Sequence, residues 1–363
     1  MKPRIIAFYL PQFHPFKEND EWWGKGFTEW TNVGKAKPLF WKHDQPKIPT
    51  ELGYYDLRVL DIRKQQVTLA KEAGIYGFCY WHYWFGDGKQ LLNEIIDEVV
   101  DSGEPDFPFC LGWANEPWKA KQWNKDGKGD RVLIDQKYSI DDYRSQYEYV
   151  SNLFKDNRYI KVGGRPFFLI YKPQNIPNVE IFIGLWNKWI KEDKIADSVY
   201  FVANLDDESD ADLYIKKGFN AVTPAHLQRT DYINSSTNAF KKILVRLLRR
   251  VFRLPLILSY AKIVKVIYKP EIDGKENVIP FLIPNWDHTP RSKNRGLVFF
   301  NSTPQLFKEQ AISLFKIIRR KSNNLVLLKS WNEWGEGNYM EPDNKWGKGY
   351  IEALSEAISS FDE

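Results

Sequence analysis

Short apolar runs alternate with amphipathic segments along most of the chain. The runs are rich in β-branched and aromatic residues, and each is followed by a polar or aromatic loop, as is typical of a buried parallel strand. Turn residues such as Gly74 mark the points where one pattern gives way to the other. The pattern predicts eight strands, at residues 4–10, 76–80, 107–111, 166–170, 199–203, 221–224, 278–283 and 325–328.

Helical periodicity separates most of these strands, at residues 57–73, 90–100, 140–154, 179–192, 211–217, 303–320 and 350–361. This alternation predicts a (β/α)8 TIM barrel with long N-terminal loops. A doubly wound open sheet is the alternative, but it requires a glycine-rich turn after the first strand, where the chain has Leu10, Pro11 and Gln12. Because no linker or repeat interrupts the pattern, we expect one domain spanning residues 1–363.

A basic helical insertion near residues 234–275 is the exception to the pattern. Between Lys241 and Lys269 the chain carries nine Lys and Arg and no acid, so the net charge of +5 arises in this segment. A charge confined to one segment argues against general nucleic-acid binding. We favour a solvated insertion packed on the barrel, since surface helices are commonly charged on one face. Peripheral contact with an anionic membrane surface is the alternative.

The composition favours the cytoplasm, with membrane association as the alternative. The apolar run before Pro11 is too short for a signal peptide, and no stretch approaches the ~20 apolar residues of a spanning helix. Cys79 and Cys110 lie inside apolar runs, as expected of buried thiols in a reducing compartment. No spacing of His, Cys, Asp and Glu predicts a metal site, so we expect neither a metal nor a cofactor.

Candidate chemistry follows the last predicted strand. Glu333 and Glu336 stand three positions apart, beside Trp331 and Trp334, in a loop composition. Paired carboxylates cleave glycosidic bonds, and apolar surroundings raise the pKa that a general acid needs. The 15 tryptophans of the chain add surfaces on which sugar rings stack. We predict that Glu333 and Glu336 are catalytic; the alternative is that they only solvate the loop or a helix N-terminus.

Polar and aromatic residues follow several other predicted strands, and we predict that they bind the sugar. Glu116 could orient a hydroxyl or act as the acid, and Asp287 could form an ion pair with Arg291 or contact substrate. The predicted substrate-binding residues are Tyr9, Gln12, His14, Trp81, His82, Tyr83, Trp113, Asn115, Glu116, Tyr171, Trp286, Asp287, Asn332 and Trp334.

Eight motifs resemble the WbsX family over nearly the whole chain. They are FYLPQFHP (8–15), WWGKGFTEWTNV (22–33), LGYYDLR (52–58), GFCYWHYWF (77–85), WANE (113–116), RPFFLIYKP (165–173), NWDHTPR (285–291) and SWNEWGEGNYMEPD (330–343). The family is described as glycosyltransferase-like and is often encoded in bacterial surface-polysaccharide clusters. It is similar in turn to the family 99 glycoside hydrolases, retaining endo-α-mannosidases and mannanases with a (β/α)8 barrel and a Glu-Trp-x-Glu motif.

The resemblance implies separate roles for the two acids. Glu333 would be the base on the sugar 2-hydroxyl, forming a 1,2-anhydro intermediate, and Glu336 the general acid. Gly335, a departure from the pattern, is interpreted as opening space beside the acid. The resemblance also implies a poly- or oligosaccharide substrate, either a bacterial surface polysaccharide or a lipid-linked glycan.

We therefore predict a retaining glycoside hydrolase or transglycosylase. The alternative is a glycosyltransferase of O-antigen, lipopolysaccharide or capsule biosynthesis. It is less favoured because the chain has no glycine-rich phosphate cradle and no Asp-x-Asp metal–nucleotide motif; the nearest acidic pairs are Asp206-Asp207 and Asp210 with Asp212. A non-catalytic glycan-binding protein is the second alternative.

Overall fold

The computed structural model describes residues 2–119, 132–224, 247 and 249–361. The chain divides into two compact units. Unit 1 comprises residues 1–75, 226–276 and 281–363, and unit 2 comprises residues 76–225 and 277–280.

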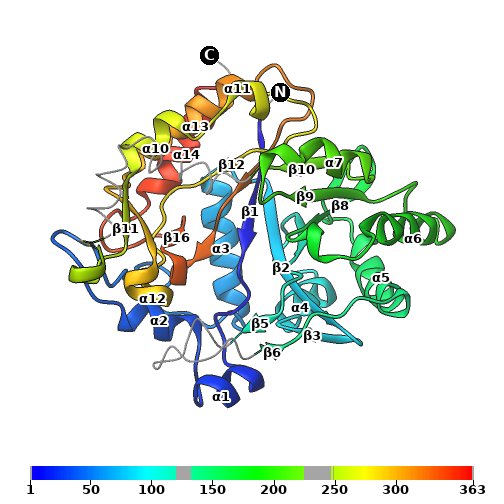
Figure 1. Ribbon diagram of the computed structural model, residues 1–363, viewed down its shortest axis with the longest axis horizontal. Coiled ribbons are helices and arrows are strands. Elements are labelled where there is room, and N and C mark those ends of the chain that lie inside the picture. The colour runs from blue at the N-terminus through cyan, green and yellow to red at the C-terminus, as the bar shows by residue number, and fades with distance from the viewer. Residues whose placement is uncertain (1, 120–131, 225–246, 248, 362–363) are drawn as a thin grey trace. The chain divides into compact units, whose positions relative to one another are not determined.

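Unit 2 contains five parallel strands in the order β10-β9-β8-β4-β2. Its apolar runs supply fully buried strands, as the absence of polar alternation predicts. Helices α5 and α6 lie beside one another next to these strands (Figure 1). The strands are β2 (Gly77–Gly86), β4 (Phe109–Trp113), β8 (Arg165–Ile170), β9 (Tyr200–Asn204) and β10 (Ala221–Thr223). The helices are α4 (Glu94–Ser102), α5 (Ile140–Phe154), α6 (Val179–Glu192) and α7 (Ala211–Lys216).

Three short antiparallel pairings and two 3-10 turns decorate unit 2. They involve β3 (Lys89–Leu91) with β2, β5 (Trp118–Lys119) with β6 (Val132–Ile134), β7 (Lys161–Val162) with β8, and the 3-10 turns Pro173–Asn175 and Glu208–Asp210. The hairpin of β2 and β3 shows that the predicted end of this strand, at residue 80, is wrong. Residues 81–86 continue the strand, because aromatic side chains favour extended backbone.

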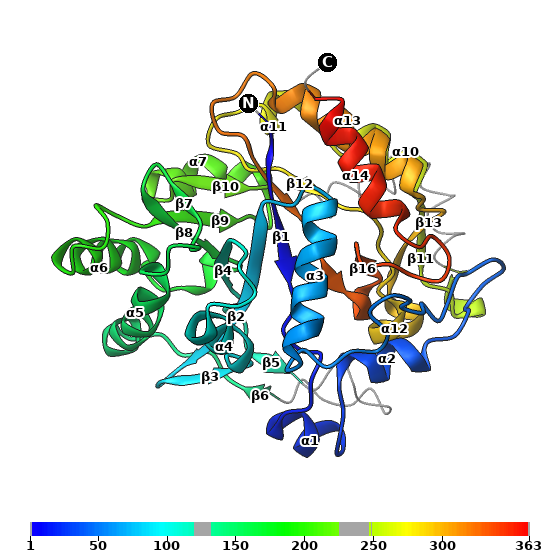
Figure 2. The ribbon, with the colours of Figure 1, turned by 180° about the vertical axis from the view of Figure 1, so that it is seen from behind.

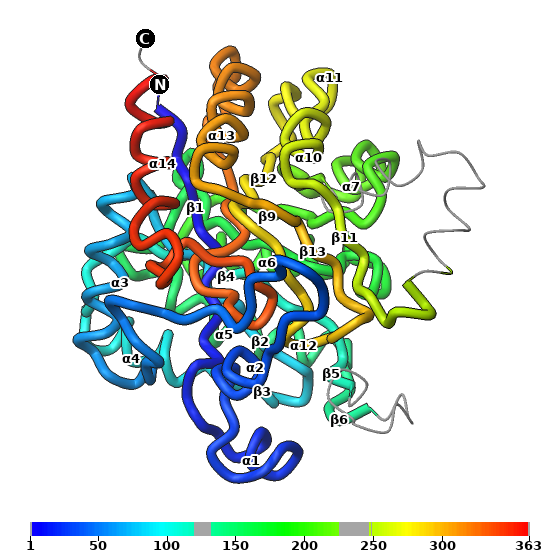
Figure 3. The backbone as a smooth tube through the Cα atoms, turned by 90° about the vertical axis from the view of Figure 1, so that its left-hand side faces the viewer, coloured from blue at the N-terminus to red at the C-terminus, as the bar shows by residue number. Residues whose placement is uncertain are grey.

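In unit 1, strand β14 (Leu325–Leu328) pairs in parallel with β1 (Arg4–Tyr9) on one side and β12 (Phe281–Leu282) on the other. Leu325 to Leu328 are fully buried, so both faces of this strand are covered. Helices α3 (Leu60–Glu72), α13 (Pro304–Ile318) and α14 (Gly349–Ser359) pack together, as Figures 2 and 3 show. The predicted long N-terminal loops contain two short helices, α1 (Lys17–Trp23) and α2 (Glu29–Lys35).

In its described residues, the basic insertion is only partly helical. Residues 241–246 and 248 of the predicted membrane-contact segment lie outside the described residues. Of the remainder, β11 (Leu256–Ser259) pairs with β13 (Leu297–Phe300), and α10 (Tyr260–Val266) and α11 (Pro270–Asp273) follow it. Strand β11 corrects the expectation of an all-helical segment. Helix α10 buries Tyr260 and Ile263 and packs against α13, so this part of the insertion belongs to unit 1.

Within the part of the chain that the structure describes, no helix is long and apolar enough to cross a membrane.

Candidate active site

The loop that carries Glu333 and Glu336 is a small hairpin in unit 1. Strand β15 (Asn332–Glu333) pairs with β16 (Asn338–Tyr339), and the 3-10 turn η5 (Trp334–Glu336) forms the tip. Glu333 ends β15 and Glu336 ends the η5 turn, so the two acids flank the tip of the hairpin. The amide of Trp331 donates to the carbonyl of Phe8 at 2.8 Å, which attaches the hairpin to the end of β1. The local fold thus presents both carboxyls together.

Arg291 joins the two carboxylates. It lies on α12 (Thr289–Ser292), which packs against the η5 turn. One guanidinium nitrogen donates to Glu333 Oε1 at 2.7 Å and another to Glu336 Oε1 at 2.8 Å. The Nε–H donates to a third carboxylate, Glu29 Oε2, at 3.0 Å. Three carboxylates therefore share one cation, and the ion pair left open between Asp287 and Arg291 is replaced by this cluster.

Glu29 enters the cluster from helix α2, which it begins. A capping box at Thr28 and Thr31 fixes this helix start. Glu29 is 2% exposed, so its charge is compensated within the protein by Arg291. Figure 1 shows α2 and α12 beside the hairpin that bears the other two acids.

Gly335 is required by this cluster. A Cβ at this position would overlap the Glu29 carboxylate and lie 2.8 Å from Arg291 Nε. The interpretation that Gly335 opens space beside the acid is therefore wrong. The space is filled by the Glu29–Arg291 ion pair.

We expect Gly335→Ala to disturb the cluster and to lower the free energy of unfolding by about 1–3 kcal/mol, the usual range for overpacking. Chemical denaturation measures the change. Gly34→Ala in helix α2 is the matched control, since its Cβ would meet no atom within 4 Å and helix propensity favours alanine. If Gly335→Ala were as stable as Gly34→Ala, the Glu29–Arg291 ion pair would be able to move aside at little energetic cost.

The two acids differ in their electrostatic surroundings. Burial raises the pKa of Glu333 to about 7, although the charge of Arg291 opposes the shift. Burial also acts on Glu336, but a hydrogen bond from His288 and the charge of Arg291 outweigh it and hold the pKa of Glu336 well below its usual range. His288 Nε2 lies 3.5 Å from Glu336 Oε1. Of the two carboxyls, Glu333 therefore binds a proton more readily than Glu336.

A further buried carboxylate, Glu341, supports the hairpin through hydrogen bonds. Its oxygens accept from Trp334 Nε1 at 2.6 Å, Gln66 Nε2 at 2.6 Å and the Tyr55 hydroxyl at 2.9 Å. Burial raises the pKa of Glu341 to about 7, even though these donors favour the ionised form. Tyr9 extends the network by donating to Gln66 Oε1 at 2.7 Å. Trp334, fully buried between the two acids of the turn, is thereby held in place.

We expect Glu341→Gln to lower the free energy of unfolding by about 1–3 kcal/mol, because its amide N–H groups would face donors that need an acceptor. Urea denaturation near neutral pH measures the effect. The exposed Glu309→Gln is the matched control and should change stability by less than about 0.5 kcal/mol. Equal stability of both variants would contradict the assigned network.

The remaining predicted binding residues of unit 1 are mostly buried. Asn332 uses its amide on the backbone of Leu10, accepting at 2.7 Å and donating at 3.0 Å, and so fixes the position of Glu333. Asp287 accepts from His43 Nε2 at 2.8 Å and Gln45 Nε2 at 2.6 Å. Further positions are His14, buried with Nδ1 3.2 Å from the Pro15 carbonyl, Gln12, which is half-buried, and Trp286, which is 7% exposed.

Unit 2 assembles its own group of predicted binding residues. Asn115 holds the backbone of Lys172 through two hydrogen bonds of 2.8 Å. Beside it Glu116 is half-buried, and burial raises its pKa although Lys172 opposes the shift. Trp81 and Tyr171, both half-buried, pack edge to face with ring centroids 5.4 Å apart. Glu116, Trp81 and Tyr171 keep accessible surface.

The other three predicted residues of unit 2 lie deeper. Trp113 is fully buried and donates through Nε1 to the Trp84 carbonyl at 2.9 Å. His82 stacks on Tyr149, and burial lowers the pKa of His82 to about 3. Tyr83 is 7% exposed and packs edge-on against Trp118. These three buried side chains contribute to the packing around β2 and β4.

Sequence reasoning missed Glu29 and Glu341 and left the partner of Arg291 open. Glu29 and Arg291 are 262 positions apart, so no local pattern connects them. Glu29, Arg291 and Glu341 all lie in motifs that carry the family resemblance, and these motifs were the one sequence signal that could have identified them. Among the described residues, no cluster of three or more His, Cys, Asp and Glu is arranged to hold a metal ion.

Comparison with solved structures defines the class of fold. The chain is similar to a "Glycoside hydrolase-like protein" (TM-score 0.64, 15% identity, 98% of this chain and 94% of that one). It is also similar to the GH99 endo-alpha-mannosidase from Bacteroides thetaiotaomicron (TM-score 0.58, 13% identity, 99% and 97% covered). These similarities confirm the predicted (β/α)8 barrel fold.

The chain belongs to the family described as Glycosyltransferase WbsX, whose model matches residues 5–354. A curated relative, "Uncharacterized protein WxcX" from Xanthomonas campestris pv. campestris (strain ATCC 33913), is 33% identical over 98% of this chain. A second protein of that name, from strain B100, is also 33% identical over 98% of the chain. The chain spans about half the length (49%) of each relative. By its description, the family is one of carbohydrate-active proteins.

Proposed function

We propose that this chain is a carbohydrate-active enzyme that cleaves glycosidic bonds with retention of configuration, acting on a bacterial surface polysaccharide or a lipid-linked glycan. The observation that carries the proposal is the hairpin of β15, η5 and β16, which places Glu333 and Glu336 within hydrogen-bond distance of a single guanidinium. Two carboxyls placed together in a buried site are what acid–base cleavage of a glycoside requires.

We propose that Glu333 is the base. It takes the proton of the sugar 2-hydroxyl while O2 attacks C1, and the departing glycosidic oxygen takes a proton from Glu336. Water then attacks C1 of the anhydro sugar, Glu336 accepts the water proton, and Glu333 returns its proton to O2. A pKa of about 7 suits a general base at neutral pH.

Glu336 needs a proton before the leaving group departs, whereas Arg291 and His288 favour its ionised form. We propose that bound substrate displaces the Arg291 nitrogen from Glu336 and so raises the pKa of this carboxyl. Arg291 would keep its contacts with Glu29 and Glu333 meanwhile.

The alternative, transfer from an activated nucleotide sugar, is supported by the description of the family. The charge cluster favours hydrolysis or transglycosylation instead. Three carboxylates surround Arg291 and accept from its Nε and both terminal nitrogens, so its positive charge is already compensated. Like charges would repel the phosphates of a nucleotide sugar. Non-catalytic glycan binding, the second alternative, predicts no turnover.

We propose that the predicted binding residues with accessible surface, Trp81, Glu116 and Tyr171, contact the glycan. The buried ones, such as Asn115 and Asn332, would position the loops around it. Loops that follow the strands carry the active site in (β/α)8 enzymes, and within unit 2 Asn115, Glu116 and Tyr171 follow the ends of β4 and β8.

The test is incubation of the purified chain with surface polysaccharide of the bacterium that encodes it, with and without nucleotide sugars. Shortening of the glycan without a nucleotide supports the proposal. Extension that requires a nucleotide sugar would establish the transferase, and binding without turnover would establish a glycan-binding protein.

We expect kcat/KM for cleavage to rise as the pH increases through about 7. The base must be ionised, and the raised pKa of Glu333 keeps it protonated below that value. A profile from about pH 5 to 9 at constant ionic strength measures this, with circular dichroism to verify the fold at each pH. A rate that falls through pH 7 would instead make Glu333 the acid.

A further inference from the structure

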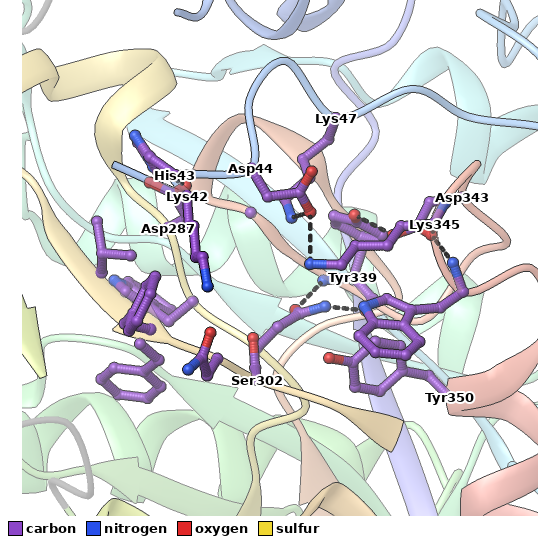
Figure 4. A pocket seen from close by; sticks show the side chains of 18 residues that line it. Lys42, His43, Asp44, Lys47, Asp287, Ser302, Tyr339, Asp343, Lys345 and Tyr350 are labelled. Carbon is purple, nitrogen blue, oxygen red and sulfur yellow. Dashed lines mark hydrogen bonds and ion pairs between the residues drawn. The ribbon is translucent and has the colours of Figure 1, made fainter. Parts of the chain in front are cut away.

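A pocket in unit 1 adjoins the hairpin that carries Glu333 and Glu336. Gly337, the residue after Glu336, lines it together with Asp287. The Asp287 amide donates to the Glu336 carbonyl at 2.7 Å, so one backbone contact forms the shared wall. Figure 4 shows the side chains that line this pocket. A group bound here would lie directly beside the proposed reaction centre.

The accessible charges of the pocket are mainly positive. Lys42, Lys47 and Lys345 line it. Lys47 and Lys345 share a single carboxylate, Asp44, at 2.5 and 3.3 Å, as the dashed lines in Figure 4 show. Lys42 is exposed, and no ion-pair partner for it occurs among the described residues. Three cations thus face one accessible carboxylate.

The other two acids of the pocket are buried and already hydrogen-bonded. Asp343 is 3% exposed and accepts from the Tyr339 hydroxyl and from the amides of Lys345 and Trp346. Asp287 is 6% exposed and accepts from His43, Gln45 and Thr289. Because their oxygens are used, these carboxylates leave the lysines available to a ligand.

Aromatic surface accompanies the cations. Trp346 and Phe300 are half-buried lining residues, and Lys345 Nζ lies 5.2 Å from the Trp346 ring centre. Trp41, next to Lys42 in the chain, is 85% exposed. Exposed indoles offer flat apolar surface to the C–H face of a sugar, while ammonium groups bind carboxylate, phosphate or sulfate.

We infer that this pocket is a subsite for an acidic sugar, a residue of the glycan that carries a carboxylate, phosphate or sulfate group. The inference rests on the proposed function, because it names the class of glycan presented to Glu333 and Glu336. Lys42 and Lys345 hold the anionic group, and the indole of Trp346 supports the ring.

The test begins with a glycan array that presents neutral and acidic glycans at low ionic strength, probed with the Glu333→Gln variant so that bound glycans stay intact. The tightest acidic glycan and its charge-neutralised derivative (carboxyl-reduced, dephosphorylated or desulfated) are then titrated calorimetrically. We expect neutralisation to weaken binding at least about tenfold, and added salt to weaken binding of the acidic form only.

Lys42→Ala combined with Lys345→Ala should lower the affinity for the acidic glycan about tenfold and leave that for the neutral derivative unchanged. Lys17→Ala with Lys188→Ala, which removes two exposed lysines elsewhere, is the matched control. Array binding that ignores charge, failure of every acidic glycan to bind, or equal effects of the two double variants would overturn the subsite. Tight, lysine-dependent binding without cleavage by the wild-type protein would support the subsite and refute only the proposed hydrolysis.

Discussion

Glu333→Gln and Glu336→Gln are each expected to reduce kcat for glycan cleavage by about 100- to 10,000-fold, the range attributed to a positioned acid or base. Glutamine keeps the size of each side chain but can neither accept the 2-hydroxyl proton nor donate one to the leaving oxygen. Its amide can still lie near Arg291, so the hairpin should retain its shape. The loss is therefore expected in kcat more than in KM.

Glu309→Gln is the control for this pair, because Glu309 is exposed on α13 and outside the cluster. The measurement is the rate of appearance of new reducing ends at saturating glycan. If a Glu336→Gln enzyme kept its rate with every leaving group, Glu336 could not be the general acid. A variant that regained activity only with leaving groups that need no proton would support the role.

Arg291→Ala is expected to lower the free energy of unfolding by about 3–5 kcal/mol, the usual cost of leaving buried charges without their partner. The change would leave Glu29, Glu333 and Glu336 together without the cation that contacts all three. Because Arg291 lowers the pKa values of Glu333 and Glu336, these values would rise in the folded variant, so the lost stability should be greatest at neutral pH. It should be partly regained as the pH falls and the carboxyls take up protons.

Arg144→Ala is the matched control, since Arg144 pairs with a single exposed carboxylate, Glu148, and such pairs contribute about 0–1 kcal/mol. Urea denaturation at several pH values measures both variants. The stability lost in Arg291→Lys should lie between the losses in Arg291→Ala and Arg144→Ala, because an ammonium group keeps the charge but lacks the planar fork that reaches three acceptors. Equal loss in Arg291→Ala and Arg144→Ala would show that the cluster adds little.

Much of the fold could be predicted because the pattern of apolar positions is local. The predicted helices 140–154 and 179–192 coincide with α5 and α6, and the buried runs became the strands of both units. The helix predicted at 90–100 begins later, at Glu94, because Lys89–Leu91 pairs back onto β2. The Asp87-Gly88 turn was a hairpin signal that the helical period obscured.

The candidate site could be predicted from the sequence only in part. Glu333 and Glu336 could be proposed as a pair because their spacing and surroundings lie within one short stretch. Arg291 and Glu29 could not be assigned to them, because ion pairs between distant segments depend on how the chain packs and leave no period or spacing behind. Trp331 and Trp334 were expected to wall a sugar site, and both are fully buried. The number of tryptophans in the composition cannot distinguish an indole that supports the fold from one that contacts a sugar.

The η5 turn also constrains how this site can change over evolutionary time. In a turn of three residues, one inserted or deleted residue would rotate the second acid by about a third of a revolution. Arg291 would then reach only one of the two carboxylates. Variation in substrate among relatives should therefore appear in the pocket and the surrounding loops, while the three-residue interval between the two acids is inherited unchanged.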